Sequence, residues 1–127
     1  MIGYVTLGTN DLERAAKFYD ALLEVIGAKR MMEEPPSFIA WGTSPDAPSL
    51  AATKPYDEQS AKAGNGTMVA LAADSPEQVD RLHAKALELG ATDEGAPGPR
   101  GDGGFYAGYF RDLDGNKLNA FCMVSSS

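Results

Sequence analysis

Residues 105–123 read FYAGYFRDLDGNKLNAFCM. Two apolar and aromatic runs flank the segment Asp112-Leu113-Asp114-Gly115, whose polar residues and glycine are typical of a turn between paired strands. We predict a β-hairpin with a one-residue bulge, in which Tyr109 pairs with Asn119. Because opposite side chains share a face, one face holds Ala107, Tyr109, Arg111, Lys117, Asn119 and Phe121, and a more apolar face holds Tyr106, Phe110, Leu118, Ala120 and Cys122.

Two amphipathic helices are predicted upstream of this hairpin. From residue 12 to residue 26, apolar residues recur at the spacing of one buried helical stripe. Asn10 is expected to cap this helix, with Glu13 completing a capping box, and Gly27 to end it. The second helix opens with Ser75-Pro76-Glu77-Gln78, an N-cap followed by proline at the first helical position, and ends at Gly90.

Short β-like segments surround both helices. We predict strands at residues 4–7, 28–32, 37–41 and 49–53, and again at 67–72, 91–94, 105–111 and 117–123. The glycine- and proline-rich segment 95–104 is expected to be a mobile loop. Residues 125–127 are expected to form a solvated tail.

The two halves of the chain follow the same order of elements. Tyr4 and Thr67 are 63 residues apart, as are Gly27 and Gly90, and both helices end in Gly-Ala. These matches indicate an internal duplication. We therefore predict a single α+β domain over residues 1–127: repeat one at 1–56, a linker at 57–65 and repeat two at 66–124. The two tandem βαβββ repeats should form a curved mixed sheet around a shared cavity, where ligands commonly bind.

Composition excludes several classes of partner. The chain of 127 residues carries a formal net charge of −7, and its eleven Lys and Arg residues do not cluster. Nucleic acid and anionic membrane surfaces both require concentrated positive charge, so neither is an expected partner. No signal peptide or membrane span is expected. Because Cys122 is the single cysteine, no intramolecular disulfide can form, and a cytoplasmic protein is expected.

The chain resembles the glyoxalase/bleomycin-resistance/extradiol-dioxygenase (vicinal oxygen chelate) superfamily. The resemblance rests on Tyr4-Val5-Thr6-Leu7 followed by Asn10-Asp11-Leu12-Glu13-Arg14, on Phe18-Tyr19, and most specifically on residues 108–116. It implies a cavity that holds a divalent metal through His, Gln or Glu side chains. Carried onto this chain, the ligand positions fall at Tyr4, Thr67 and Asn119, with a fourth near Ala51. Because none is a His or a carboxylate, we expect neither a metal nor another cofactor.

Several other residues are candidates for ligand contact. In the fosfomycin-resistance branch of the superfamily, a tyrosine at the position of Tyr109 contacts the substrate; the alternative is a tyrosine packed in the cavity mouth. Arg100 lies in a glycine-rich loop and is suited to binding an anion, or is simply solvated. Phe38 and Trp41 face opposite ways, and Phe38 is the better candidate to line the cavity, as is Phe121.

Two further side chains have structural interpretations. His83 lies on the buried stripe of the second helix and is expected to pack there rather than act as a base. Cys122 should be a buried, inert thiol. The catalytic residues, if there are any, are not identified by the sequence.

Two functions remain open at this point. The first is a metal-independent small-molecule binding protein, like the bleomycin-resistance branch. The alternative is an enzyme of lyase, dioxygenase or thiol-transferase type with an atypical or metal-free site that uses Tyr109 or Arg100. The superfamily also implies a homodimer.

Overall fold

A strand, a helix and three strands follow one another twice in the computed structural model, which describes residues 1–124. The first repeat contains β1 (Tyr4–Gly8), α1 (Leu12–Glu24), β2 (Lys29–Glu34), β3 (Phe38–Gly42) and β4 (Ser49–Thr53). The second contains β5 (Val69–Ala72), α2 (Pro76–Glu88), β6 (Thr92–Pro99), β7 (Phe105–Arg111) and β8 (Lys117–Met123). The predicted α+β fold of tandem βαβββ repeats is confirmed, and the predicted tail at residues 125–127 lies outside the described residues.

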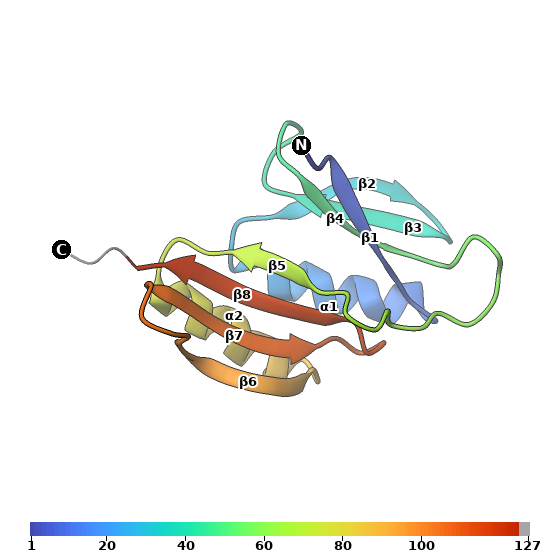
Figure 1. The fold of residues 1–127 in the computed structure, drawn as a ribbon. Helices are drawn as coiled ribbons and strands as arrows, with labels where there is room; N and C mark the ends of the chain where they lie inside the picture. The colour runs from blue at the N-terminus through green and yellow to red at the C-terminus, as the bar shows by residue number, and fades with distance from the viewer. Residues whose placement is uncertain (125–127) are drawn as a thin grey trace.

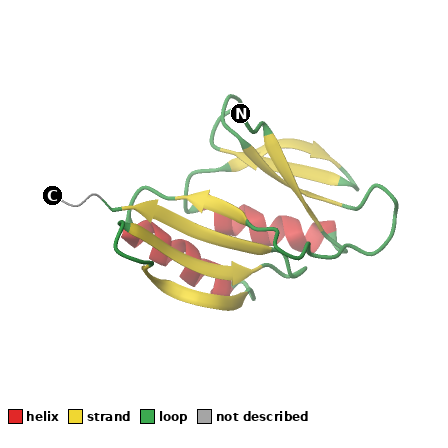
Figure 2. Cartoon of the chain, viewed as in Figure 1, coloured by secondary structure: helices red, strands yellow, loops and turns green. Residues whose placement is uncertain are grey.

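Each repeat forms its own four-stranded mixed sheet with one helix packed against it (Figures 1 and 2). The strand order is β1-β4-β3-β2 in the first sheet, sheet A, and β5-β8-β7-β6 in the second, sheet B. Within residues 1–124 no strand of one sheet contacts a strand of the other, whereas α1 and α2 touch each other. Each sheet therefore keeps an open face, the face turned away from its own helix.

Helix α1 begins one residue later than its capping pattern predicts. Its N-cap is Asp11, whose carboxylate accepts a hydrogen bond of 3.0 Å from the amide of Arg14. The predicted capping box of Asn10 with Glu13 is therefore wrong. The Asn10 side chain accepts a 2.7 Å hydrogen bond from the amide of Ala61 and donates a 3.3 Å hydrogen bond to the carbonyl of Ala61. Asn and Asp cap helices about equally well, so this contact with the linker decides between them.

Helix α2 begins and ends where the sequence predicts. Ser75 is the N-cap and accepts a 3.2 Å hydrogen bond from the amide of Gln78. The Gln78 side chain also donates to the carbonyl of Val25, just after α1, and so ties the two helices together. Gly27 and Gly90 both have positive φ, 76° and 104°, a conformation that glycine adopts without a steric penalty.

A single core lies between the helices and the sheets. Trp41 on β3 is 1% exposed and packs against Tyr19 of α1, with its indole N–H donating to Asp20 at 2.8 Å. Leu22 and Leu82, one from each helix, are fully buried in the same cluster. Burying one such leucine contributes about 1.5–3 kcal/mol. Because side chains alternate between the faces of a strand, Phe38, three positions before Trp41, lies on the other face of β3, as predicted.

The β7–β8 hairpin has the predicted register. Tyr109 pairs with Asn119 and Arg111 with Lys117. Residues 112–116 therefore connect the strands, one residue more than a four-residue turn would have. Gly115 within the turn has φ 88°, which is why a glycine is needed there. The predicted division of side chains between the two faces follows from this register.

The duplication is real, but its register differs by one residue between the ends of the helices. The two N-caps, Asp11 and Ser75, are 64 residues apart, whereas the two terminal glycines are 63 apart. The parallel pairing of β1 with β4 repeats in β5 with β8, with Val5 and Val69 64 residues apart in the first strands and Leu50 and Leu118 68 apart in the second. By the 64-residue spacing of the first strands, Tyr4 corresponds to Met68. Thr67 lies before β5, in a turn where its amide donates to the carbonyl of Gly64.

Half of the segment predicted as a mobile loop is a strand. β6 continues to Pro99 and pairs with β7, with register shifts between Asp93 and Gly95 and between Gly95 and Gly98. β-bulges of this kind allow glycine and proline inside an edge strand. The prediction of a loop over all of 95–104 is therefore wrong, and the irregular part is residues 100–104.

Buried hydrogen bonds join the first repeat to the β7–β8 turn. The carboxylate of Asp112, 6% exposed, accepts from the Tyr19 hydroxyl, from the amides of Asp114 and Asn116, and from the Asn116 side chain. Asn116 also donates to the carbonyl of Gly8 at the end of β1. This set of contacts, the Asp112 network, fixes the turn of sheet B against α1 and β1.

Candidate functional site

The open face of sheet B is the more polar of the two open faces at its centre. Tyr109 and Asn119 lie opposite each other there, with Ala70 of β5 on the other side of Asn119. On the opposite face, Phe110 and Leu118 are fully buried beneath α2. The packing of α2 thus turns the side chains of Tyr109 and Asn119 toward the open face.

Asn119 is buried, yet one of its polar atoms has no partner. The residue is 1% exposed, and its Oδ1 is the only buried side-chain nitrogen or oxygen in residues 1–124 without a hydrogen bond. An unsatisfied buried acceptor costs about 1–3 kcal/mol. A buried acceptor without a partner calls for an explanation, and a bound ligand that supplies the missing donor is one.

Two cationic side chains converge on the ring of Tyr109. The Arg100 guanidinium and the Lys117 ammonium each lie 5.5 Å from the ring centroid. Gly95, at the register shift of β6, lies close to both groups: a Cβ there would be 3.4 Å from Tyr109 and from Arg100. The β6 bulge therefore lets Arg100 reach over the strand to the ring.

Arg100 is partly exposed, and two of its guanidinium nitrogens already donate hydrogen bonds within the chain. It donates to the carbonyl of Ala96 at 2.6 Å and to that of Gly98 at 3.3 Å. These bonds hold the bulged end of β6. Its positive charge nevertheless remains beside Tyr109, and no carboxylate pairs with it within the described residues.

Aromatic pairs extend both open faces. Phe121 stacks on Phe105 with the ring centroids 5.7 Å apart, on the same face as Asn119. On sheet A, Tyr4 meets Phe38 edge to face at 6.4 Å. The predicted site residues thus divide into two groups: Arg100, Tyr109, Asn119 and Phe121 on sheet B, and Tyr4 and Phe38 on sheet A.

The linker covers part of the open face of sheet A. A hollow of about 1100 Å³ is lined there by Thr6, Phe38 and Thr53 and by residues 54–62, which include the first part of the linker. All of its lining residues come from the first repeat and the linker. The double hydrogen bond between Asn10 and Ala61 holds the linker in place. In the sequence, Asn10 fits a helix-capping pattern, and for this reason its contact with the linker is not predicted.

The superfamily's metal-ligand positions carry weak donors. With the corrected register they are Tyr4, Met68, Ala51 and Asn119. Divalent catalytic sites need about three His or carboxylate ligands, and a phenol, a thioether and one amide do not meet that need. Within residues 1–124, no three His, Cys, Asp or Glu side chains gather in a way that could hold a metal ion.

His83 and Cys122 have the structural environments that the sequence indicates. His83 is 5% exposed, and its Nε2 lies 3.1 Å from Oδ1 of Asp93 and 3.2 Å from the carbonyl of Tyr109. The amide of Gly95 and the His83 ring lower the pKa of Asp93. Burial raises the pKa of the Cys122 thiol, which makes it less reactive.

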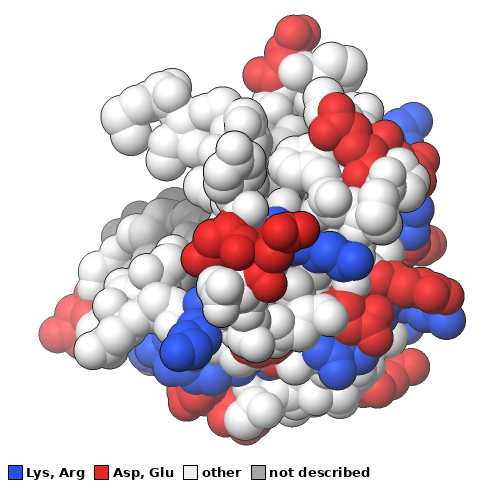
Figure 3. Space-filling model, turned by 90° about the vertical axis from the view of Figure 1, so that its right-hand side faces the viewer, with Lys and Arg blue, Asp and Glu red and all other residues white. Residues whose placement is uncertain are grey.

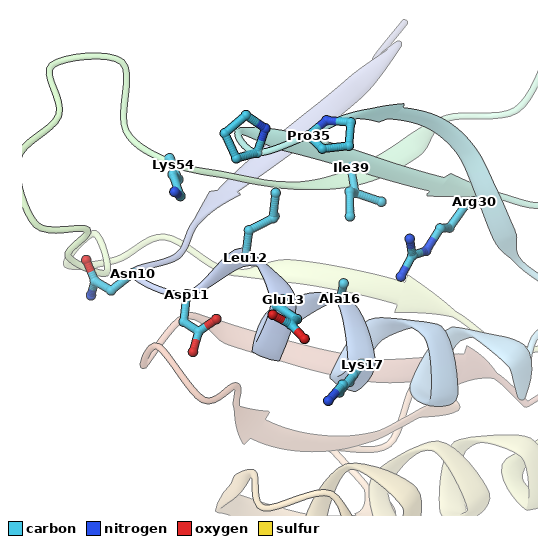
Figure 4. A pocket seen from close by; sticks show the side chains of 11 residues that line it. Asn10, Asp11, Leu12, Glu13, Ala16, Lys17, Arg30, Pro35, Ile39 and Lys54 are labelled. Carbon is cyan, nitrogen blue, oxygen red and sulfur yellow. The ribbon is translucent and has the colours of Figure 1, made fainter.

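A second crevice lies on the helix side of sheet A, between the first turn of α1 and the turn that joins β2 to β3 (Figure 4). Leu12 and Ile39 point toward each other across it, and Lys54 and Arg30 stand at its two ends (Figure 4). Its volume is about 550 Å³. None of the predicted site residues lines it.

Acidic and basic side chains are interspersed on the face shown in Figure 3, where Lys and Arg do not form a continuous patch. Neither helix within residues 1–124 combines the length and apolarity that a bilayer-spanning segment requires.

The family model and solved structures that match this chain agree on one superfamily. The model of the Glyoxalase/Bleomycin resistance protein/Dioxygenase superfamily matches residues 1–120. A solved glyoxalase/bleomycin resistance protein from Albidiferax ferrireducens is 39% identical, with a TM-score of 0.88, over 98% of this chain and 99% of that chain. No protein with a curated function matches.

More distant solved structures share the fold. A glyoxalase/bleomycin resistance protein/dioxygenase family enzyme from Burkholderia phytofirmans is 21% identical, with a TM-score of 0.76, over 96% of this chain and 98% of that one. A lactoylglutathione lyase from Agrobacterium tumefaciens is 22% identical, with a TM-score of 0.69, over 96% and 92%.

Proposed function

The chain belongs to the glyoxalase/bleomycin resistance protein/dioxygenase superfamily, and we propose that it binds a small organic molecule without a metal. The observation that carries this proposal is the orphaned Oδ1 of Asn119 on the open face of sheet B. Relatives that use a metal place a charged ligand at this position. An amide oxygen in the same place is suited to accept a hydrogen bond directly from a ligand.

The neighbouring groups support binding rather than metal chemistry. Tyr109 offers a hydroxyl, Lys117 a cation, and Phe121 an apolar ring on the same face. Pockets that hold small molecules combine apolar walls with a few placed polar groups. Tyr4, Met68 and Ala51 add no His or carboxylate to Asn119, so no step of a metal-dependent reaction is assigned to this chain.

Thermal-shift screening in the presence of chelator tests this proposal. Small acids, antibiotics and dicarbonyls form a suitable library. We expect at least one compound to raise the midpoint of unfolding in chelator, because binding to the native state stabilises it. Stabilisation that appears only after a divalent ion is added would contradict the proposal.

We also propose that the protein is a homodimer. β1 and β5 each pair with a single strand, so each leaves an edge unpaired within the described residues. Exposed apolar side chains lie on or beside these strands, among them Ile2, Tyr4 and Met68. Unpaired edges with apolar neighbours favour association.

Light scattering tests the dimer. We expect twice the chain mass of 13.4 kDa at micromolar concentration. Replacing Tyr4 with lysine should shift the protein toward the monomer, whereas replacing the fully exposed Tyr56, which lies outside both edge strands, with lysine should not. A mass of 13.4 kDa for the unmodified protein would contradict the proposal.

A further inference from the structure

The cations on the open face of sheet B are unusual in this acidic protein. Four of the eleven Lys and Arg residues pair with a carboxylate: Arg14, Arg30, Lys85 and Arg111. Five others have no such partner in the described residues but are exposed: Lys17, Lys29, Lys54, Lys62 and Arg81. Arg100 and Lys117 have no such partner within residues 1–124, although both are partly buried beside Tyr109. Two partly buried cations around one ring raise the local potential and attract an anion.

Lys117 is the cation with donors to spare. Arg100 uses two of its nitrogens on backbone carbonyls. The side chain of Lys117 makes no hydrogen bond in the described part of the chain, so its ammonium group keeps three free donors. The long, flexible stem of Lys117 can carry these donors to an anionic group, while Arg100 contributes charge from a fixed position.

Asn119 lies two residues beyond Lys117 on the same strand and the same face. Alternate residues of a strand are about 7 Å apart, and this spacing suits the two ends of one small ring. A donor at one end would satisfy Oδ1 of Asn119, and an anion at the other would meet Lys117. Tyr109 lies opposite Asn119 on β7, and the small, exposed Ala70 lies on its other side on β5.

We infer that the open face of sheet B binds aromatic acids that carry a hydroxyl or N–H donor remote from the acid group. The inference rests on the proposed function and adds the class of ligand. Because Oδ1 is buried, binding requires a neighbouring side chain to move so that the donor can reach it.

Three probes of nearly equal shape test the inference: 4-hydroxybenzoate, benzoate without the donor, and 4-hydroxybenzamide without the charge. Titrated into the ¹⁵N-labelled full chain, 4-hydroxybenzoate should perturb amides of β7 and β8 and bind about tenfold more tightly than either analogue. Lys117→Gln should weaken 4-hydroxybenzoate several-fold and leave 4-hydroxybenzamide unchanged. Lys29→Gln, an exposed site on β2, is the matched control and should change neither.

The possible outcomes separate this inference from the proposed function. If the amide binds to β7 and β8 as tightly as the acid, or if Lys117→Gln and Lys29→Gln behave alike, the ligand class is wrong while the binding face stands. If no probe at about 10 mM perturbs the amides of sheet B, any binding is too weak to be useful, and the ligand class is also wrong. Screening in chelator then decides independently whether the protein binds small molecules.

Discussion

Replacing Asp112 with alanine is expected to lower the free energy of unfolding by about 3 kcal/mol or more. The Asp112 carboxylate accepts four hydrogen bonds, from Tyr19, Asp114 and twice from Asn116. Alanine would leave these donors buried without an acceptor. A domain of this size has a total stability of about 5–15 kcal/mol, so the loss should lower the melting temperature by about 10 °C.

Denaturant unfolding measures this effect, and Asp102→Ala, in the exposed loop between β6 and β7, is the matched control. Tyr19→Phe, which removes one donor, should cost about 1 kcal/mol. An Asp112→Ala variant as stable as Asp102→Ala would show that the Asp112 network does not hold the repeats together.

The same network predicts a dependence on pH. Burial and the Asp112 carboxylate raise the pKa of Tyr19 well above 10.0. The unfolded chain therefore releases this proton at lower pH than the native protein does. Stability should fall as the pH rises above about 10, and the fall should be smaller in Tyr19→Phe.

Replacing Asn119 with leucine is expected to weaken ligand binding without lowering the stability of the protein. Leucine removes the buried acceptor that lacks a partner, so the free energy of unfolding should stay the same or increase by about 1 kcal/mol. The true ligand loses its acceptor and should bind roughly ten- to a hundredfold more weakly. Tyr109→Phe should also weaken the ligand by about tenfold without loss of stability.

Calorimetric titration of the ligand found by screening measures these affinities, with Phe105→Leu as a control for changes in packing on the same face. If that ligand keeps its affinity in both Asn119→Leu and Tyr109→Phe, it binds elsewhere. A large loss of stability in Asn119→Leu would instead show that Asn119 has a structural partner.

Much of the fold could be predicted because local signals agreed. The hairpin around Gly115 combines alternating side chains with a turn that needs a glycine, which fixed its register and therefore paired Tyr109 with Asn119. Helix α2 has a strong cap and a proline at its start. These features depend on residues close together in the chain.

The errors arose where distant contacts decided between similar local choices. Asn10 and Asp11 are both good caps, and the linker claims Asn10. One extra residue before Gly27 shifted the match between repeats from Met68 to Thr67. The β6 bulges, which let Gly95 and Gly98 lie in a strand, depend on pairing with β7. The orphaned Oδ1 of Asn119 depends on side-chain packing around it, which no spacing in the sequence reveals.

The metal content of the native protein tests the central claim most directly. Protein purified without chelator and without an affinity tag would be measured by elemental analysis for Zn, Ni, Mn and Fe. With only a phenol, a thioether and one amide at the four ligand positions, we predict less than about 0.1 divalent ion per chain. About one ion per chain, lost when Asn119 is replaced by leucine, would contradict a metal-independent site.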